Sequence, residues 1–312
     1  MCEDSFMSKY NTTVYKGIAM LAIMICHLAG QFGGGAVKVF TPFGGIGVAI
    51  FLVLSAYGLN ESWNAAKRSN DRTPWTGWWR KRFLAVWLPY MIVQVALYWP
   101  RHKFNFLDFA LDLTCLRPLY SKGWYLSYLF LWYAVFYLVR RVRVLDRFRR
   151  PIFLAVSVVF FFIHPEIRAE QAFSFFCGLM ISEYKPHKLL KLRNAIALTG
   201  FGVVFLAVKQ LPAVRAMPTV LVNFVQLCIK LPVGLGLMML AWFLFRRFTA
   251  KPLYAVGVIS YELYLVHGYV LDAVPKTALG ALIFAVGSIA ASAAFWFVLT
   301  KTKKWQKKLL RI

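Results

Sequence analysis

Residues 44–60 read GGIGVAIFLVLSAYGLN, a run of seventeen positions without a single charged side chain. A helix that crosses the hydrocarbon core of a bilayer needs about 20 mostly apolar residues. Somewhat fewer are enough when flanking side chains reach back to the interface. The run is therefore predicted to be a transmembrane helix.

Similar runs recur along the whole chain of 312 residues, 60% of which are hydrophobic and 17% aromatic. We count ten candidate spans, near residues 12–31, 44–60, 83–100, 124–140, 151–168, 169–183, 195–211, 219–245, 252–272 and 279–300. Pro165 and Glu166 interrupt the fifth and sixth of these, but a pair of spans is needed there because both flanking segments are basic. The sequence predicts an all-α polytopic membrane helix bundle of about ten transmembrane helices.

The distribution of basic residues predicts how this bundle is oriented. The segments assigned to the inside carry 27 Lys and Arg residues, and those assigned to the outside carry 9. Loops on the cytoplasmic side are enriched in Lys and Arg, so both termini are predicted to be cytoplasmic and the protein to be a multi-pass protein of the cytoplasmic membrane. The net charge of +25 is explained by this topology and by contact with anionic membrane lipids, so we expect no nucleic-acid partner.

Residues 1–312 are expected to form a single membrane-embedded domain. The tail at residues 301–312 alternates basic residues with Trp305, Leu309 and Leu310, and Lys301 to Arg311 is predicted to be a short interfacial helix on the inner leaflet. The five cysteines are scattered and form no CxxC pair, so we predict neither a disulfide framework nor a metal site.

Polar side chains inside a bilayer are costly, so each one in a predicted span is a candidate functional residue. These residues are Lys16, His27, Gln94, Ser127, Gln226, Lys230, Glu262 and His267. Lys16 and His27 are eleven positions apart, which places them on one helix face about 16 Å apart along the axis. Lys16 would lie near the inner interface and His27 in the outer half. The alternative is a snorkelling lysine and a packed, hydrogen-bonded histidine.

Two further features concern the last third of the chain. Lys230 and Glu262 both fall near the middle of their spans, where an unpaired charge costs roughly 3 kcal/mol or more. We expect them to form a buried ion pair, although each could instead face a separate wet cavity. Residues 232–236, PVGLG, indicate a break in the eighth span.

Five short motifs together resemble the acyltransferase 3 family of bacterial membrane acyltransferases. They are KGIAMLAIMICH at residues 16–27, GVAIFLVLSAY at 47–57, RKRFL at 80–84 with Pro89 following, GWYLS at 123–127, and SYELYLVH at 260–267. The resemblance extends from about residue 12 to about residue 300, in the family's order and with its number of spans. Any one of these motifs is weak evidence, and it is the five in register that make the resemblance specific.

The chain departs from the family pattern at several positions. The usual arginine is Lys16, which keeps the charge but not the planar, bidentate grip on phosphate. An acidic residue common in the second helix is replaced by Ala49, and a basic position after the third motif by Ala85. Where some members have an acidic residue after the serine of the fourth motif, this chain has Tyr128 and Leu129.

The resemblance implies transfer of an acyl group, commonly acetyl, from acyl-CoA to a hydroxyl group. The acceptor would be a surface glycan, its lipid-linked precursor or a related small molecule. Lys16, Arg80, Lys81 and Arg82 would meet the phosphates of CoA at the inner face. The pantetheine arm would then reach between the helices towards His27. Plain positive-inside topology is the alternative explanation for Lys81 and Arg82.

His27 would either deprotonate the acceptor hydroxyl or carry the acyl group itself. Ser127 and His267 are expected at a similar depth and are further catalytic candidates. Trp124 is placed on the acceptor side, with interfacial anchoring as its alternative role.

Two other classes of function compete with an acyltransferase. A transporter or flippase for a glycan or small molecule would often show paired repeats with broken helices in both halves, and no such repeat is found. A catalytically inactive homologue, acting as a membrane scaffold or sensor, would be consistent with the departures at Lys16, Ala49 and Ala85.

Overall fold

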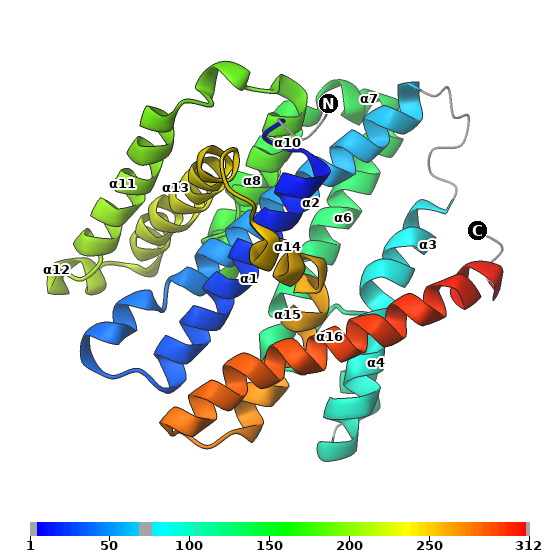
Figure 1. The fold of residues 1–312 in the computed structure, drawn as a ribbon. Coiled ribbons are helices and arrows are strands. Elements are labelled where there is room, and N and C mark those ends of the chain that lie inside the picture. Colours follow the sequence, from blue (N-terminus) through cyan, green and yellow to red (C-terminus); the bar gives the residue numbers. More distant parts are fainter. Residues whose placement is uncertain (1–4, 69–76, 104, 310–312) are drawn as a thin grey trace.

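The computed structural model describes residues 5–68, 77–103 and 105–309, and within these ranges every regular element is a helix (Figure 1). The predicted all-α class is confirmed. The longer helices are α1 (Lys9–Gln31), α2 (Phe43–Arg68), α6 (Trp124–Arg141), α8 (Arg149–Ile163), α10 (Ser174–Tyr184), α11 (Leu192–Val208), α13 (Thr219–Phe245), α14 (Lys251–Val258), α15 (Ser260–Ala273) and α16 (Ala278–Leu309). The shorter ones are α3 (Trp78–Arg82), α4 (Leu88–Val93), α5 (Phe106–Leu113), α7 (Arg143–Arg147), α9 (Glu166–Ala169) and α12 (Pro212–Arg215).

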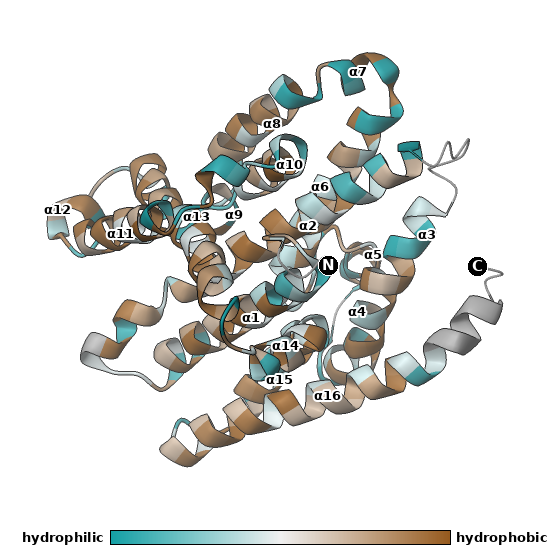
Figure 2. Cartoon of the chain, turned by 45° about the horizontal axis from the view of Figure 1, so that its top comes forward, coloured by the Kyte–Doolittle hydropathy of each residue, from teal (hydrophilic) through white to brown (hydrophobic). Residues whose placement is uncertain are grey.

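Five helical segments in the described part of the chain are long and apolar enough to cross a membrane. They are Lys9–Gln31, Val37–Arg68, Trp78–Arg101, Thr219–Phe245 and Ala278–Thr302. Figure 2 shows hydrophobic residues along α8, α11, α13 and α16, and hydrophilic residues gathered at α7. The chain is a membrane protein, whereas the count of ten spans and the orientation of the termini stay predictions.

Several predicted spans differ from the observed helices. The prediction of a break in the eighth span is wrong, because α13 continues through Pro232. Gly236 instead allows α13 to approach Thr199 of α11 closely. The ninth span is the broken one, since α14 ends at Val258 and α15 begins at Ser260.

The carboxyl end also differs from its prediction. Helix α16 continues as far as Leu309, so the basic tail extends the last helix and no separate interfacial helix begins near Lys301. Residues 310–312 of the predicted tail lie outside the described residues.

Helix α1 runs through the centre of the bundle and packs against α2, α14 and α15 (Figure 1). Its contact with α14 is made backbone to backbone. A Cβ atom at Gly17 would overlap the Leu253 carbonyl, and one at Gly257 would overlap the Thr13 carbonyl. Small residues allow membrane helices to approach this closely. The contact fixes the depth and rotation of α1, and with them the position of both Lys16 and His27.

A core of large aromatic side chains holds α6 against its neighbours. Trp132 of α6 is fully buried and stacks on Phe175 of α10, with ring centroids 4.7 Å apart. The pair α11 and α13 packs at one edge of the bundle, where α13 also contacts α2 (Figure 1). Helices α1 and α15, which carry His27 and His267, pack against each other beside this core.

Candidate active site

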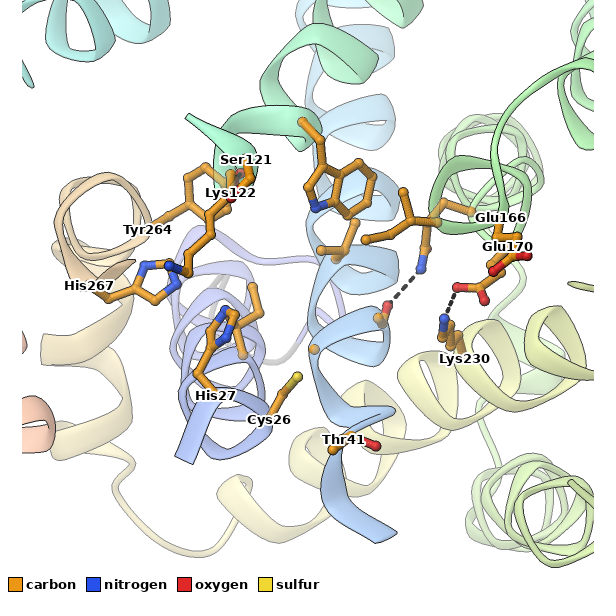
Figure 3. A pocket seen from close by; sticks show the side chains of 17 residues that line it. Cys26, His27, Thr41, Ser121, Lys122, Glu166, Glu170, Lys230, Tyr264 and His267 are labelled. Atoms are coloured by element: carbon orange, nitrogen blue, oxygen red, sulfur yellow. Dashed lines mark hydrogen bonds and ion pairs between the residues drawn. The ribbon is translucent and has the colours of Figure 1, made fainter. Parts of the chain in front are cut away.

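A cavity of about 480 Å³ opens between α1, α2, α13 and α15 (Figure 3). It lies near the carboxyl end of α1, away from the N-terminus. We call it the histidine cavity because His27 and His267 both line it. Its other polar lining residues are Cys26, Thr41, Ser121, Lys122, Trp124, Glu166, Glu170, Gln171, Lys230 and Tyr264. Six separate segments of the chain thus contribute polar side chains to one space.

The two histidines lie side by side although 240 residues separate them, because α1 and α15 pack together. Their ring centroids are 5.1 Å apart and the ring planes are inclined by 40°. The Nδ1 atom of His267 lies 2.9 Å from the Leu263 carbonyl oxygen. A carbonyl can only accept, so Nδ1 carries the proton and Nε2 of a neutral His267 is a proton acceptor. This Nε2 is buried and has no hydrogen-bond partner among the described residues.

A charged cluster that the sequence did not single out lies beside the histidines. Lys122 Nζ is 2.6 Å from Asp272 Oδ1 and donates to Tyr120 Oη at 3.1 Å, and Tyr120 Oη donates to Asp272 Oδ2 at 3.0 Å. Burial and, next, the Asp272 carboxylate raise the pKa of the Tyr120 hydroxyl, which therefore stays protonated as the donor. A Cβ at Gly268, next to His267, would overlap both Tyr120 and Lys122. Gly268 thus lets the lysine lie against α15.

The opposite wall of the histidine cavity contains a buried ion pair. Lys230 Nζ bonds to the Glu170 carboxylate, and both side chains are almost fully buried (Figure 3). The predicted pair of Lys230 with Glu262 is wrong. Depth estimates from the sequence placed Glu262 at the same level, but they could not place Glu170, which lies in the turn after α9 and faces into the cavity.

Trp124 and Ser127, both on α6, have different surroundings. Trp124 lines the histidine cavity, and its place on the acceptor side stays a prediction. Ser127 does not line it. Its Oγ accepts a 2.6 Å hydrogen bond from Arg168 Nη2 and donates to the Trp124 carbonyl at 3.0 Å. The structure therefore places Ser127 as a support for Arg168, beside the cavity wall.

A second cavity of about 190 Å³ lies nearer the start of α1. We call it the lysine cavity because Lys16 lines it together with Ser55, Tyr125 and Tyr133. Tyr264 lines both cavities. Its hydroxyl donates to the Lys122 carbonyl at 2.5 Å, and its ring meets that of Tyr125 edge to face. Tyr264 therefore lies between the two spaces.

The predicted basic residues of α3 lie at unequal distances from the lysine cavity. The Arg82 guanidinium lies 4.8 Å from the centre of the Trp78 ring, and that ring is 6.2 Å from Tyr133, which lines the cavity. Arg80 is half-buried and Lys81 is exposed, and neither lines a cavity described here.

The structure contains no candidate metal site in the ranges it describes, where no three His, Cys, Asp or Glu side chains gather closely enough to hold an ion. The polar groups of the site are instead two imidazoles, an ammonium group bound to a carboxylate, and a buried ion pair. Such an arrangement can accept a proton and stabilise a developing negative charge.

Comparison with known proteins agrees with this chemistry. A family model described as an acyltransferase domain matches residues 12–301, nearly the whole chain. No curated protein and no solved structure matches the chain. The match covers the helices that carry both histidines, Lys16 and the arginine-rich α3. The chain belongs to the acyltransferase 3 family, and it is a membrane acyltransferase that transfers groups other than aminoacyl groups.

Proposed function

We propose that the protein transfers an acyl group, most readily acetyl, from acyl-CoA to a hydroxyl of a surface glycan, of its lipid-linked precursor or of a related small molecule. The observation that carries this proposal is the pair of cavities that meet at Tyr264. One contains Lys16, and the other contains the two histidines. A donor bound by its phosphates on one side could thus present its thioester to a base on the other.

The donor would bind from the side on which Lys16 and Arg82 lie. Both are cations, and CoA carries several phosphate charges that a cation attracts. Tyr133 and Tyr125 line the lysine cavity with aromatic rings, which suit the slim, uncharged pantetheine arm. Tyr264 must then move, or its hydroxyl must leave the Lys122 carbonyl, for the thioester to enter the histidine cavity.

The transfer step follows from the two imidazoles. The unprotonated nitrogen of His27 accepts the proton of the acceptor hydroxyl as that oxygen attacks the thioester carbonyl carbon. The new C–O bond forms, the C–S bond breaks, and the CoA thiolate takes up the proton from the imidazolium. His267 lies within ring contact of His27, and the Leu263 carbonyl fixes its tautomer. It therefore orients His27 and stabilises the imidazolium, while the proton stays on His27 until the thiolate takes it. An alternative route passes the acyl group through His27 itself.

Lys122 would stabilise the negative charge that develops on the thioester carbonyl oxygen during the attack. Its ammonium lines the histidine cavity and is held by Asp272 and Tyr120, so it is preorganised before the substrate arrives. A fixed charge aimed at a developing oxyanion is commonly the largest single contribution to catalysis.

The acceptor would occupy the remainder of the histidine cavity. Its far wall carries the Glu166 carboxylate and the Trp124 ring. Beside them lie Glu170, which is paired with Lys230, and Gln171, whose side-chain amide is hydrogen-bonded to the backbone of α2. A carboxylate can accept hydrogen bonds from several hydroxyls at once, and an aromatic face suits the apolar face of a sugar ring. These features support a hydroxyl-rich acceptor.

The proposal is tested with purified protein in proteoliposomes that contain a glycan or lipid-linked glycan acceptor and acetyl-CoA labelled in its acetyl group. We expect release of free CoA together with label on the acceptor, and mass analysis of surface glycans should lose the corresponding acetyl mass when the protein is absent. Release of CoA without an acylated product would point to hydrolysis, and no release would contradict the proposed donor.

A further inference from the structure

An apolar groove of about 570 Å³ lies at the other end of the bundle, between α10, α11, α13 and the N-terminal segment. Apart from Asn194, every residue that lines it is apolar. The lining includes Phe6, Ile181, Leu198, Phe201, Leu235 and Met239. A groove of this composition favours a hydrocarbon chain over any polar ligand.

A smaller cavity of about 210 Å³ adjoins the groove, and Phe6, Ile181, Pro186 and Leu190 line both. The rest of its lining is largely polar and comprises Ser5, Met7, Tyr57, Lys185 and His187. Hydroxyl, ammonium and imidazole groups are the donors that bind a phosphate group. The groove and the smaller cavity together are thus complementary to an amphipathic molecule with an anionic head group.

The charge around the smaller cavity is positive. The loop between α10 and α11 carries Lys185, Lys188 and Lys191. The acidic residue nearest to it along the chain, Glu183, already accepts 2.5 Å hydrogen bonds from both Arg149 and Arg150. A second acidic residue, Glu61, lies near Tyr57 and accepts a 2.7 Å hydrogen bond from Ser182. The Glu183 carboxylate is therefore paired with these two arginines and does not neutralise the lysines.

Lys185 has an unusual backbone conformation at the end of α10. Its φ of 43° is left-handed, a region in which glycine is favoured and a residue with a Cβ is disfavoured. A lysine here is disfavoured by conformation, and its side chain lines the smaller cavity.

We propose that the groove and the smaller cavity form one binding site for an anionic phospholipid, with the phosphate beside Lys185 and His187 and an acyl chain in the groove. Basic residues at the surface of a membrane attract anionic lipids, which is the charge complementarity that the loop offers. Because α10, α11 and α13 all contribute to the groove, the lipid would hold the α11–α13 pair against the rest of the bundle. The site lies apart from Lys16, so it is independent of the proposed donor path.

The test compares Tm of the full-length protein in phosphatidylcholine nanodiscs with and without added phosphatidylglycerol. Wild type should gain roughly 2–4 °C with the anionic lipid, because a ligand of the folded state stabilises it. Lys185→Gly should lose this gain. It should keep or exceed the wild-type Tm in pure phosphatidylcholine, because glycine relieves the left-handed backbone. Lys38→Ala, which removes an exposed lysine outside this loop and outside both linings, should keep the gain.

A second pair of variants tests the groove. Ala197→Trp would fill the groove and should lose the gain, whereas Ala207→Trp on the same helix, outside the lining, should keep it. The proposal is overturned if wild type shows no gain, if Lys185→Gly or Ala197→Trp keeps it, or if inorganic phosphate alone reproduces it. None of these readouts depends on acyl transfer, so their failure is distinct from failure of the proposed function.

Discussion

Lys230 of α13 and Glu170, in the turn after α9, form a buried ion pair in the wall of the histidine cavity. The pair ties the edge helix α13 to the segment that carries Glu166 and Gln171. It thereby holds the acceptor-side wall of the cavity in place, and removing one partner leaves the other charge buried without compensation.

The first prediction is therefore strong coupling between these two residues. Lys230→Met and Glu170→Gln should each lower the free energy of unfolding by about 3–5 kcal/mol, and the double variant should lose less than the sum. Folded yield and Tm in detergent measure this. Lys230→Met combined with Glu262→Gln should instead give additive losses, and strong coupling there with none to Glu170 would contradict the observed pairing.

Lys16 should act on binding of the donor. Lys16→Glu would repel the phosphates of CoA and should raise KM for acetyl-CoA at least roughly tenfold, a change of about 1.4 kcal/mol, with a smaller effect on kcat. Lys16→Arg should be tolerated or improve binding, because a guanidinium grips phosphate with two hydrogen bonds. Lys9→Glu, on the same helix but outside the lysine cavity, is the control. A KM unchanged by Lys16→Glu would remove this residue from the donor path.

Gly17 is predicted to be essential for packing. The Cβ of Gly17→Ala would overlap the Leu253 carbonyl and force α1 and α14 apart, which should cost about 1–3 kcal/mol of stability. Gly30→Ala, near the end of the same helix, meets nothing within 4 Å and should be neutral or stabilising. Thermal unfolding of the two variants in one detergent compares them directly. Equal Tm values would show that the helices do not touch as described.

Lys122 is predicted to act on the chemical step. Lys122→Met should lower kcat by about 10²–10³-fold with a small change in KM, because the charge it stabilises develops only in the transition state. Asp272→Asn should have a weaker effect in the same direction, since it loosens the ammonium. Lys276→Met removes an exposed lysine near the same end and should be silent. Loss of affinity for the acceptor, with kcat unchanged, would assign Lys122 to binding instead.

Much of the fold could be predicted from the sequence, because a bilayer imposes long apolar helices whose residues can simply be counted. The break between α14 and α15 was missed, since the chain there remains apolar. At Pro232 the sequence predicts a break that the structure does not have, because neighbouring helices accommodate a proline inside a long membrane helix. Periodicity and hydropathy describe one helix at a time, and such breaks depend on packing between helices.

The candidate site was predictable only in part, for the same reason. His27, His267 and Lys16 were identified because polar residues within apolar runs stand out. Lys122 lies in a loop just before the motif at residues 123–127, and only its adjacency to that motif could have pointed to it. The sequence does not point to Glu170 as the partner of Lys230, because depth along a helix gives the level of a residue in the membrane and not its direction around the bundle.

The central claim is that His27, supported by His267, carries out acyl transfer in the histidine cavity. The measurement that tests it most directly is the rate of acetyl transfer from labelled acetyl-CoA by His27→Ala in proteoliposomes, with His102→Ala as a control outside the cavity. We predict a loss of at least about 10²-fold for His27→Ala, with unchanged folded yield, and a normal rate for the control. A His27→Ala protein that transfers acetyl at the wild-type rate would contradict the claim. If His267→Ala alone abolished transfer, the base would be assigned to α15.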